Sequence, residues 1–315
     1  MIRRSLFAVV VWLFAATAFS ANRPFRSYRV TVDHQGQVFQ SLDGDSVTSV
    51  PLETEVRARR WKLGVDYPPA LLGSNRVLLV NSTSLEGIAI DWNGLPVGHP
   101  LSEVDRLAGL THRVRLAWRL RDRWRASVFT SLGFQGDWAR FSGRMAQWRG
   151  GAVVSRALGA NVDLGLGAGL LNEFGEPGIY PILTLGLHSE ERLDSAPPGT
   201  HVVSLRIPVS AAYWYVLSER VRAGGEIKAL GGSYFLTREG PYRKTTLDMS
   251  QVQLGPAVHW RLARGFAVEA NVGVAARRRW FIHSGNTELE KLMIKNAGFA
   301  RIDLSWKIGS AAWDE

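Results

Sequence analysis

Hydrophobic and polar residues alternate one by one along most of the chain after about residue 24. In 110–120, every second position is Leu, His, Val or Trp, and arginine, alanine or threonine fills the positions between. Segments 266–277 and 299–308 repeat this pattern. A period of two residues is that of a β-strand with one apolar face, and no segment shows a convincing helical period. The pattern therefore predicts an all-β chain.

Further strands are expected between stretches of turn-forming residues. They lie at 25–33, 54–66, 76–90, 124–136, 146–157, 161–171, 178–188, 201–217, 220–231 and 247–261. Pro208 interrupts one of them and cannot donate a backbone hydrogen bond, so a chain reversal there would split 201–217 into 202–207 and 209–217. With the reversal the count is about 14 strands, and without it about 12.

The connections between these strands alternate in length. Very short turns are expected at 121–123, 159–161, 218–220 and 263–265, and longer polar connections at 137–145, 172–177, 232–246 and 278–296. Aromatic side chains on the apolar face gather beside the short turns, and the candidates for an interface girdle are Trp118, Trp124, Tyr215, Trp260, Phe266 and Trp306. Short turns on one side, long loops on the other and aromatic girdles are typical of barrels in bacterial outer membranes.

These features predict that residues 23–315 form a closed antiparallel transmembrane β-barrel of about 12–14 strands. The competing architecture is a water-soluble sandwich of two sheets, which shows the same alternation. A barrel of this size falls between barrels of about 8 strands, which side chains fill, and barrels of about 16 strands, which hold a water channel. A narrow lumen is therefore expected.

The first 22 residues have the features of a signal peptide. Arg3 and Arg4 precede the apolar run 6–16, and small residues at 16–18 or 18–20 offer cleavage sites. We interpret 1–22 as a Sec signal peptide, with an uncleaved anchor helix as the alternative. Export through this signal places the chain outside the cytoplasm, in a Gram-negative bacterium if the barrel interpretation is right.

Composition removes several classes of protein. The chain has no cysteine, which excludes disulfides, cysteine-ligated metal sites and a thiol nucleophile. Beyond residue 22 no apolar run reaches the roughly 20 residues that a membrane-spanning helix needs. The 38 lysines and arginines exceed the 28 acidic residues, but they form no localised patch, so nucleic acid is not an expected partner.

Several local sequences resemble those of Gram-negative outer-membrane β-barrels, above all the porin-like barrels known only as domains of unknown function. The most particular are Ile179-Tyr180-Pro181-Ile182-Leu183-Thr184-Leu185-Gly186, Arg206-Ile207-Pro208 and Tyr213-Trp214-Tyr215. The resemblance covers 25–308 as a pattern and implies insertion by the barrel assembly machinery, among outer-membrane lipid and lipopolysaccharide. It carries no catalytic residues. Such barrels usually end on an aromatic residue, whereas here Trp306 is followed by 307–315.

If the apolar face meets lipid, the opposite face lines the lumen and is cationic. The candidate lumen residues are Arg113, Arg115, Arg119, Arg125, Arg206, Arg222, Glu226, Lys228, Glu269, Arg277, Arg301 and Asp303, and the same reasoning adds Arg57, Arg59, Asp163 and Lys307. Fixed positive charge in a narrow pore concentrates anions. One hypothesis is therefore a channel for anionic or small polar solutes. The other is a closed structural barrel, in which the arginines pair with inward carboxylates.

Two further hypotheses concern binding and catalysis. Arg277, Arg278 and Arg279 could contact lipopolysaccharide phosphates, or they form a solvated loop rim. A lipid-modifying enzyme would use a residue such as His112 or His259, but the chain has neither a HExxH pair nor a G-x-S-x-G elbow. We therefore expect no catalytic residues, no metal and no cofactor.

Overall fold

The structure is a computed structural model that describes residues 28–44, 46, 48–72, 77–120, 123–159, 161–171, 178–187, 196–263 and 265–308. The predicted signal peptide, 1–22, lies outside these residues. So do the expected connection 172–177 and parts of three expected short turns.

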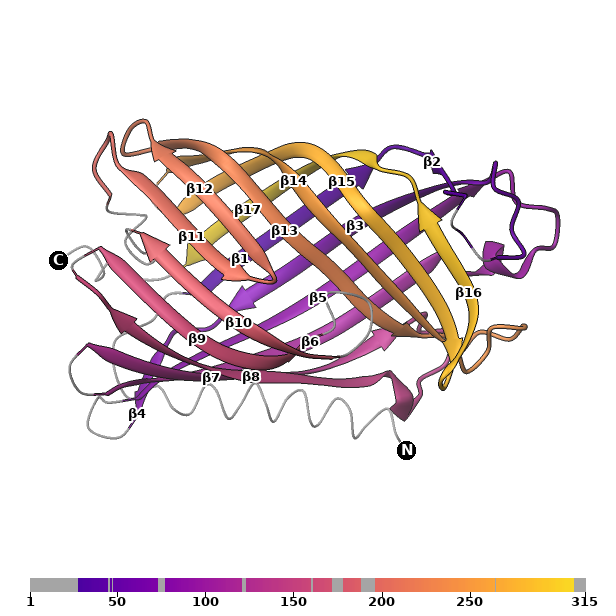
Figure 1. Ribbon diagram of the computed structural model, residues 1–315, viewed down its shortest axis with the longest axis horizontal. Helices are drawn as coiled ribbons and strands as arrows, with labels where there is room; N and C mark the ends of the chain where they lie inside the picture. Colours follow the sequence, from indigo (N-terminus) through magenta and orange to yellow (C-terminus); the bar gives the residue numbers. More distant parts are fainter. Residues whose placement is uncertain are drawn as a thin grey trace.

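Fourteen antiparallel strands form the wall of a closed barrel (Figure 1). They are β1 (Tyr28–Gln37), β3 (Glu55–Asp66), β5 (Val77–Asn93), β6 (Arg106–Arg119), β7 (Trp124–Gly136), β8 (Ala146–Ala157), β9 (Val162–Leu171), β10 (Gly178–Leu187), β11 (His201–Ile207), β12 (Ser210–Val216), β13 (Val221–Phe235), β14 (Thr246–Ala263), β15 (Phe266–Ser284) and β17 (Ala297–Ile308). Each strand pairs with the next along the chain, and β17 closes the barrel against β1 with Tyr28 opposite Ile308.

Smaller elements lie at the two rims. They are the strands β2 (Gln40–Ser41), β4 (Ala70–Leu72) and β16 (Thr287–Ile294) and the 3-10 helices η1 (Pro100–Glu103) and η2 (Gly143–Met145). We call the rim where β6 meets β7, β8 meets β9, β12 meets β13 and β14 meets β15 the short-turn rim. The opposite rim, which carries η1, η2 and β16, is the loop rim.

The predicted all-β barrel is confirmed, and so is the chain reversal at Pro208. Strands β11 and β12 form a hairpin in which Arg206 pairs with Ser210, and the Ile207–Pro208 peptide bond is cis. The reversal gives the count of 14 strands, so the alternative of 12 is wrong. The expected loop 278–296 is also wrong, because β15 continues to Ser284 and β16 pairs with it.

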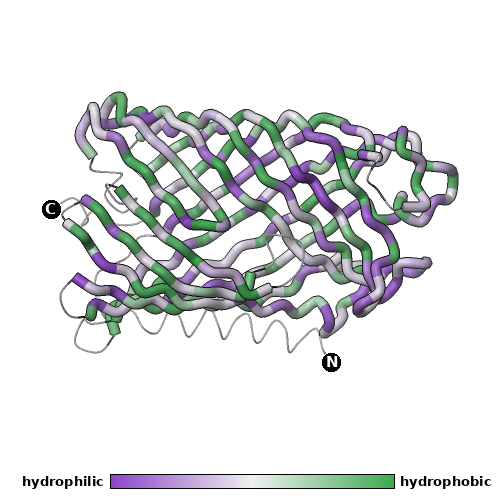
Figure 2. Tube along the Cα trace, in the orientation of Figure 1, coloured by the Kyte–Doolittle hydropathy of each residue, from purple (hydrophilic) through white to green (hydrophobic). Residues whose placement is uncertain are grey.

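Hydrophobic and hydrophilic residues alternate along many of the strands, as the colours in Figure 2 show. Residues that pair across neighbouring strands point to the same face of the wall. The face that carries the exposed apolar side chains is the outer face of the barrel. Leu166, Val272 and Ile302 are 67%, 55% and 51% exposed on this outer face. Polar and charged side chains, with apolar clusters toward the rims, occupy the inner face. This arrangement is that of a barrel wall in an apolar surrounding.

Strands β14 and β15 approach each other closely at two inward glycines. A Cβ atom on Gly255 would lie 1.9 Å from the carbonyl oxygen of Val272, and one on Gly273 would lie 2.1 Å from that of Leu254. Because these contacts are with backbone atoms, a side chain forces the strands apart. We expect Gly255→Ala to destabilise the folded barrel by about 1–3 kcal/mol, measured by urea unfolding in lipid vesicles. Gly36→Ala is the matched control, since its Cβ would meet nothing within 4 Å.

Candidate functional site: the barrel interior

Packed apolar side chains fill the interior at the loop rim. The buried members of this outer cluster are Leu42, Val50, Val56, Ile88, Ile90, Leu101, Val104, Leu107, Tyr234, Leu236, Leu247, Met249, Trp280, Ile282, Leu292 and Ile294. They come from seven strands and from the connections that follow β1, β5 and β13. Because alternate residues of the wall strands point inward here, these side chains meet one another rather than the outside. The outer cluster therefore occludes the interior at this rim.

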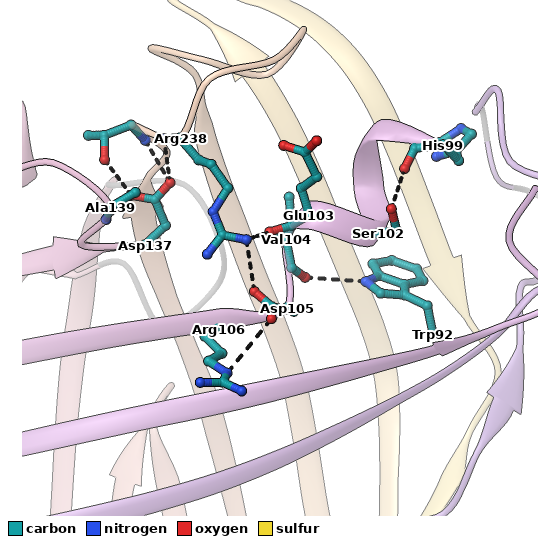
Figure 3. A network of polar contacts seen from close by, with 11 residues as sticks. Trp92, His99, Ser102, Glu103, Val104, Asp105, Arg106, Asp137, Ala139 and Arg238 are labelled. Atoms are coloured by element: carbon teal, nitrogen blue, oxygen red, sulfur yellow. Dashed lines mark hydrogen bonds and ion pairs between the residues drawn. The ribbon is translucent and has the colours of Figure 1, made fainter. Parts of the chain in front are cut away.

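A polar network ties together three connections above the outer cluster (Figure 3). The carboxylate of Asp137 accepts hydrogen bonds from the backbone N–H groups of Thr237 and Arg238 at 2.8 and 2.7 Å. The guanidinium of Arg238 in turn contacts Asp105 at 3.0 Å and donates to the backbone carbonyl of Glu103. The connections β5–β6, β7–β8 and β13–β14 are thus held to one another by charge-assisted hydrogen bonds.

Glu290 of β16 holds the β2–β3 connection, 42–54, beyond the wall strands. Ser49 donates to it from both its backbone N–H (3.0 Å) and its hydroxyl (2.7 Å), and the Tyr242 hydroxyl donates at 2.9 Å. Burial opposes ionisation, but the hydrogen bonds from Thr48, Ser49 and Tyr242 outweigh it and hold the pKa of Glu290 below its ordinary value.

A carboxyl whose pKa is lowered by folding stabilises the fold above its unfolded pKa, and this stability is lost as pH falls through the folded pKa. We therefore expect amide protection of Ser49 in hydrogen exchange to be complete above about pH 5 and to fall below about pH 4. In Glu290→Gln the protection should be weaker at neutral pH and independent of pH in this range. An unchanged pH dependence in the variant would contradict the role of Glu290.

A buried charged network lies on the inner face next to the outer cluster. Glu86 of β5 pairs with Arg60 of β3 at 2.5 Å and accepts hydrogen bonds from the Tyr234 hydroxyl at 3.0 Å and from Gln135 at 3.2 Å. The Glu86 side chain is 9% exposed. These contacts link β3, β5, β7 and β13 across the interior.

A second inward cluster joins residues that the sequence analysis placed in the lumen. Arg301 contacts Glu226 at 2.6 Å, Glu269 at 2.9 Å and Asp303 at 2.9 Å, and Lys228 lies 3.7 Å from Glu226. The Arg301 side chain is only 4% exposed. Three carboxylates around one guanidinium form a compensated cluster, as the closed-barrel hypothesis expects of this part of the wall.

Further arginines lie on the inner face nearer the short-turn rim. Arg113, Arg115 and Arg119 lie on the same face of β6, and Arg125 of β7 pairs with Arg119. All four side chains are exposed. Arg206 on β11 is exposed as well. In the described part of the chain, Arg113, Arg119, Arg125 and Arg206 make no hydrogen bond or ion pair. We call the part of the interior that these exposed guanidiniums border the chamber.

The chamber wall is not uniform. Across the interior from β6 and β7, the buried side chains Val202, Trp214, Val216 and Ala257 form an inward apolar cluster with Ala196 of the connection that follows β10. Arg222, which is 4% exposed, lies on the inner face of the neighbouring strand β13. The side of the chamber that carries the exposed arginines therefore lies opposite an apolar side.

Three arginines expected in the lumen lie elsewhere. Arg57 and Arg59 share the outward face of β3 with the exposed Trp61 and Leu63, and both pair with Asp91, at 3.0 and 3.2 Å. A β-bulge between β14 and β15 removes Arg277 from the strict alternation, and its side chain lines a cavity with Ile207 and Ile227, whose side chains are exposed on the outward face.

The sequence analysis missed the network around Glu86. Arg60 lies on the opposite face of β3 from Arg57 and Arg59, which were expected in the lumen. Tyr234 lies beyond the end of the expected strand 220–231. In β3 the apolar Trp61 and Leu63 mark the outward face, so the alternation there would have placed Arg60 and Lys62 inward and Arg57 and Arg59 outward. Trp61 and Leu63 are therefore the sequence signal that could have assigned the residues of β3 to the correct faces.

The six candidate girdle residues all lie on the outward face near the short-turn rim. Trp124, Tyr215, Trp260 and Trp306 are 41%, 37%, 52% and 56% exposed, and Trp118 and Phe266 are half-buried between neighbours. Phe266 pairs with Trp306 across β15 and β17.

The described residues include no helix that is both long and apolar enough to cross a membrane, and no group of three potential metal ligands.

A family described as a domain of unknown function, DUF6268, matches residues 104–296. This match spans more than half of the chain, and the chain therefore belongs to that family. It runs from the end of η1 to the end of β16, so it includes the cationic strands β6 and β7. No curated protein matches the chain.

Solved structures resemble the chain at low identity. An outer membrane channel from Pseudomonas putida F1 has a TM-score of 0.48 and 8% identity, over 91% of this chain and 97% of that one. The toluene transporter TodX of P. putida has a TM-score of 0.39 and 9% identity, over 93% of this chain and 92% of that one.

Proposed function

We propose that the chain is an outer-membrane barrel of a Gram-negative bacterium, exported by a Sec signal peptide and inserted by the barrel assembly machinery. The exposed apolar outer face supports this proposal, because contiguous apolar surface of this extent is costly in water. The aromatic residues at the short-turn rim are suited to a membrane interface, where one end of each ring is apolar and the other meets water.

We propose further that the interior forms a narrow, porin-like channel that favours anionic and small polar solutes. The observation that carries this proposal is a set of exposed guanidiniums that make no hydrogen bond or ion pair among the described residues: Arg113, Arg119, Arg125 and Arg206. A barrel built only for stability would pair such charges, as Arg301 is paired. Positive charge in a confined aqueous space raises the local concentration of anions.

The outer cluster favours the closed structural barrel as the second candidate function. Its packed side chains occlude the interior at the loop rim, so passage of a solute there requires the loop-rim connections to move. Under the channel proposal, the described state is the closed one. The two candidates therefore differ in whether the outer cluster ever opens.

Catalysis has less support. His112 accepts or donates one hydrogen bond with Thr83, at 2.9 Å, and no carboxylate contacts its ring among the described residues. His259 lies 3.7 Å from Glu269 but faces the charged interior cluster rather than lipid. Among the described residues, neither histidine contacts both a nucleophile and a carboxylate that would orient its ring. We therefore propose that the barrel is not an enzyme.

Planar-bilayer recording of the purified protein tests the channel. We expect discrete single-channel steps and, in a salt gradient, a reversal potential that shows preference for anions. Removing the guanidinium of Arg238 with Arg238→Gln should increase the open fraction, because it releases the β5–β6 connection from the β13–β14 connection. If both the wild type and this variant insert and stay silent, the closed structural barrel is correct.

A further inference from the structure

The barrel wall has a recess on its outer side because one hairpin is short. The β11–β12 hairpin reverses at Pro208, whereas β13 runs on past its tip to Phe235 (Figure 1). The β12–β13 ladder ends at Ser210 and Lys228, and Ala229 still donates a backbone hydrogen bond to Val209 at 2.8 Å. Strand β13 next pairs with β7, at Phe235 and Gly136, so residues 230–234 have no partner strand on that side. The recess above the hairpin tip is a cavity of about 390 Å³.

The lining of this cavity is amphiphilic. Leu205, Ile207 and Ile227, which belong to the outward face of β11 and β13, provide an apolar part. Arg277 and Arg279 of β15 provide a cationic part. A site with adjacent apolar and cationic walls complements an anionic amphiphile better than it complements a free inorganic ion, which gains nothing from the apolar wall.

A β-bulge determines the directions in which Arg277 and Arg279 point. The register between β14 and β15 shifts between Ser250 and Val252, and Arg277 at the bulge has a φ of 50°, a value that arginine rarely adopts. Beyond the bulge the phase of β15 is reversed, so Arg278 points inward, where Gln37 accepts a hydrogen bond from it at 2.8 Å. Arg279 points outward. Bulges commonly redirect side chains in this way.

Among the described residues, Arg277 and Arg279 have no counter-ion, unlike the outward Arg57 and Arg59. Both side chains are exposed, and neither makes a hydrogen bond or ion pair in the described part of the chain. At the same rim, Arg57 and Arg59 both pair with Asp91. Two neighbouring guanidiniums without an acidic partner form a ready binding site for a phosphate group.

The height of the cavity fits the outer boundary of a membrane. Arg277 follows the girdle residue Phe266 by 11 positions along β15. At about 3.3 Å per residue and a tilt of about 40°, it lies about 28 Å above the girdle, just beyond an apolar band of about 25 Å. Phosphorylated headgroups of the outer leaflet lie at this level.

We propose that this cavity binds a phosphorylated, acylated lipid of the outer leaflet, with its phosphate on Arg277 and Arg279 and an acyl chain against Leu205, Ile207 and Ile227. The proposal rests on the membrane embedding proposed above but not on conduction. Lipid bound here covers 230–234, the part of β13 that pairs with neither β12 nor β7 on this side, and so stabilises the wall at its shortest hairpin.

Native mass spectrometry of the detergent-solubilised protein tests this site, with diphosphorylated lipid A as the probe. We expect one lipid A to bind, and Arg277→Gln with Arg279→Gln to weaken its binding at least about tenfold, the loss that one charge-assisted hydrogen bond accounts for. Arg57→Gln with Arg59→Gln is the matched control and should leave binding unchanged. Heat-modifiable migration in SDS gels checks that every variant is folded.

Two further probes identify the source of the anion. Dephosphorylated lipid A should bind the wild type as weakly as diphosphorylated lipid A binds the double variant. Inorganic phosphate at the same concentration should not displace lipid A. Equal binding of lipid A by the wild type and the Arg277/Arg279 variant overturns the proposal, and displacement by inorganic phosphate shows a site for free anions instead. Either failure in a protein that still inserts into bilayers leaves the proposed function intact.

Discussion

Glu86→Ala is expected to destabilise the barrel by about 3 kcal/mol, the lower end of the range for breaking a buried ion pair. The change leaves the guanidinium of Arg60 without its carboxylate and the hydroxyl of Tyr234 without its acceptor. The lower end applies because the Arg60 side chain keeps 22% exposure and retains some hydration. Urea unfolding of the protein in lipid vesicles, followed by tryptophan fluorescence, measures the loss.

The double variant Arg60→Met with Glu86→Leu separates a buried charge from a lost contact. Replacing both partners by apolar residues removes the uncompensated guanidinium, so most of the stability should return. A double variant as unstable as Glu86→Ala would mean that the geometry of the pair, and not its charge balance, holds the barrel at this level.

Replacing Arg113, Arg119 and Arg125 together by serine is expected to abolish anion preference in bilayers. The three guanidiniums are exposed on the inner face and make no ion pair among the described residues, so the field of the chamber depends on them directly. The ratio of anion to cation permeability, taken from the reversal potential in a salt gradient, should fall to about one. The size of the single-channel steps should change less.

The matched control is Arg57→Ser with Arg59→Ser, which removes two arginines of the outward face. Its reversal potential should equal that of the wild type, because outward charges do not line the chamber. If the triple variant keeps its anion preference, the selectivity arises from another part of the interior, such as the cluster around Arg301.

Most of the wall could be predicted from the sequence because hydrophobic residues recur at every second position along much of most strands. Pro208 could be read as a reversal because it removes a backbone donor from the middle of a strand. The hairpin of β15 and β16 could not, because the hydrophobic residues Leu292 and Ile294 pack into the outer cluster rather than against lipid, and the segment between them and β15 is polar. Its turn is marked by Gly285, whose φ of 60° suits glycine.

The site could be predicted only in part. Alternation with large apolar residues placed Arg113, Arg115 and Arg119 on the inner face, and it also brought Glu226, Glu269 and Arg301 to one face. The phase of β3 was misassigned, and a one-residue error moves every side chain to the other face. The outer cluster could not be predicted from strand periodicity, because it depends on three connections that fold back over the interior.

The central claim is that the outward apolar face contacts lipid and the inward face contacts water, and cysteine accessibility tests it most directly. The natural chain has no cysteine, so single substitutions report without background. In membrane-inserted protein, a hydrophilic, membrane-impermeant maleimide should label Ser127→Cys on the inner face and leave Leu166→Cys and Val272→Cys on the outer face unlabelled. Labelling of the outer positions by this reagent in the membrane-inserted protein would contradict the account.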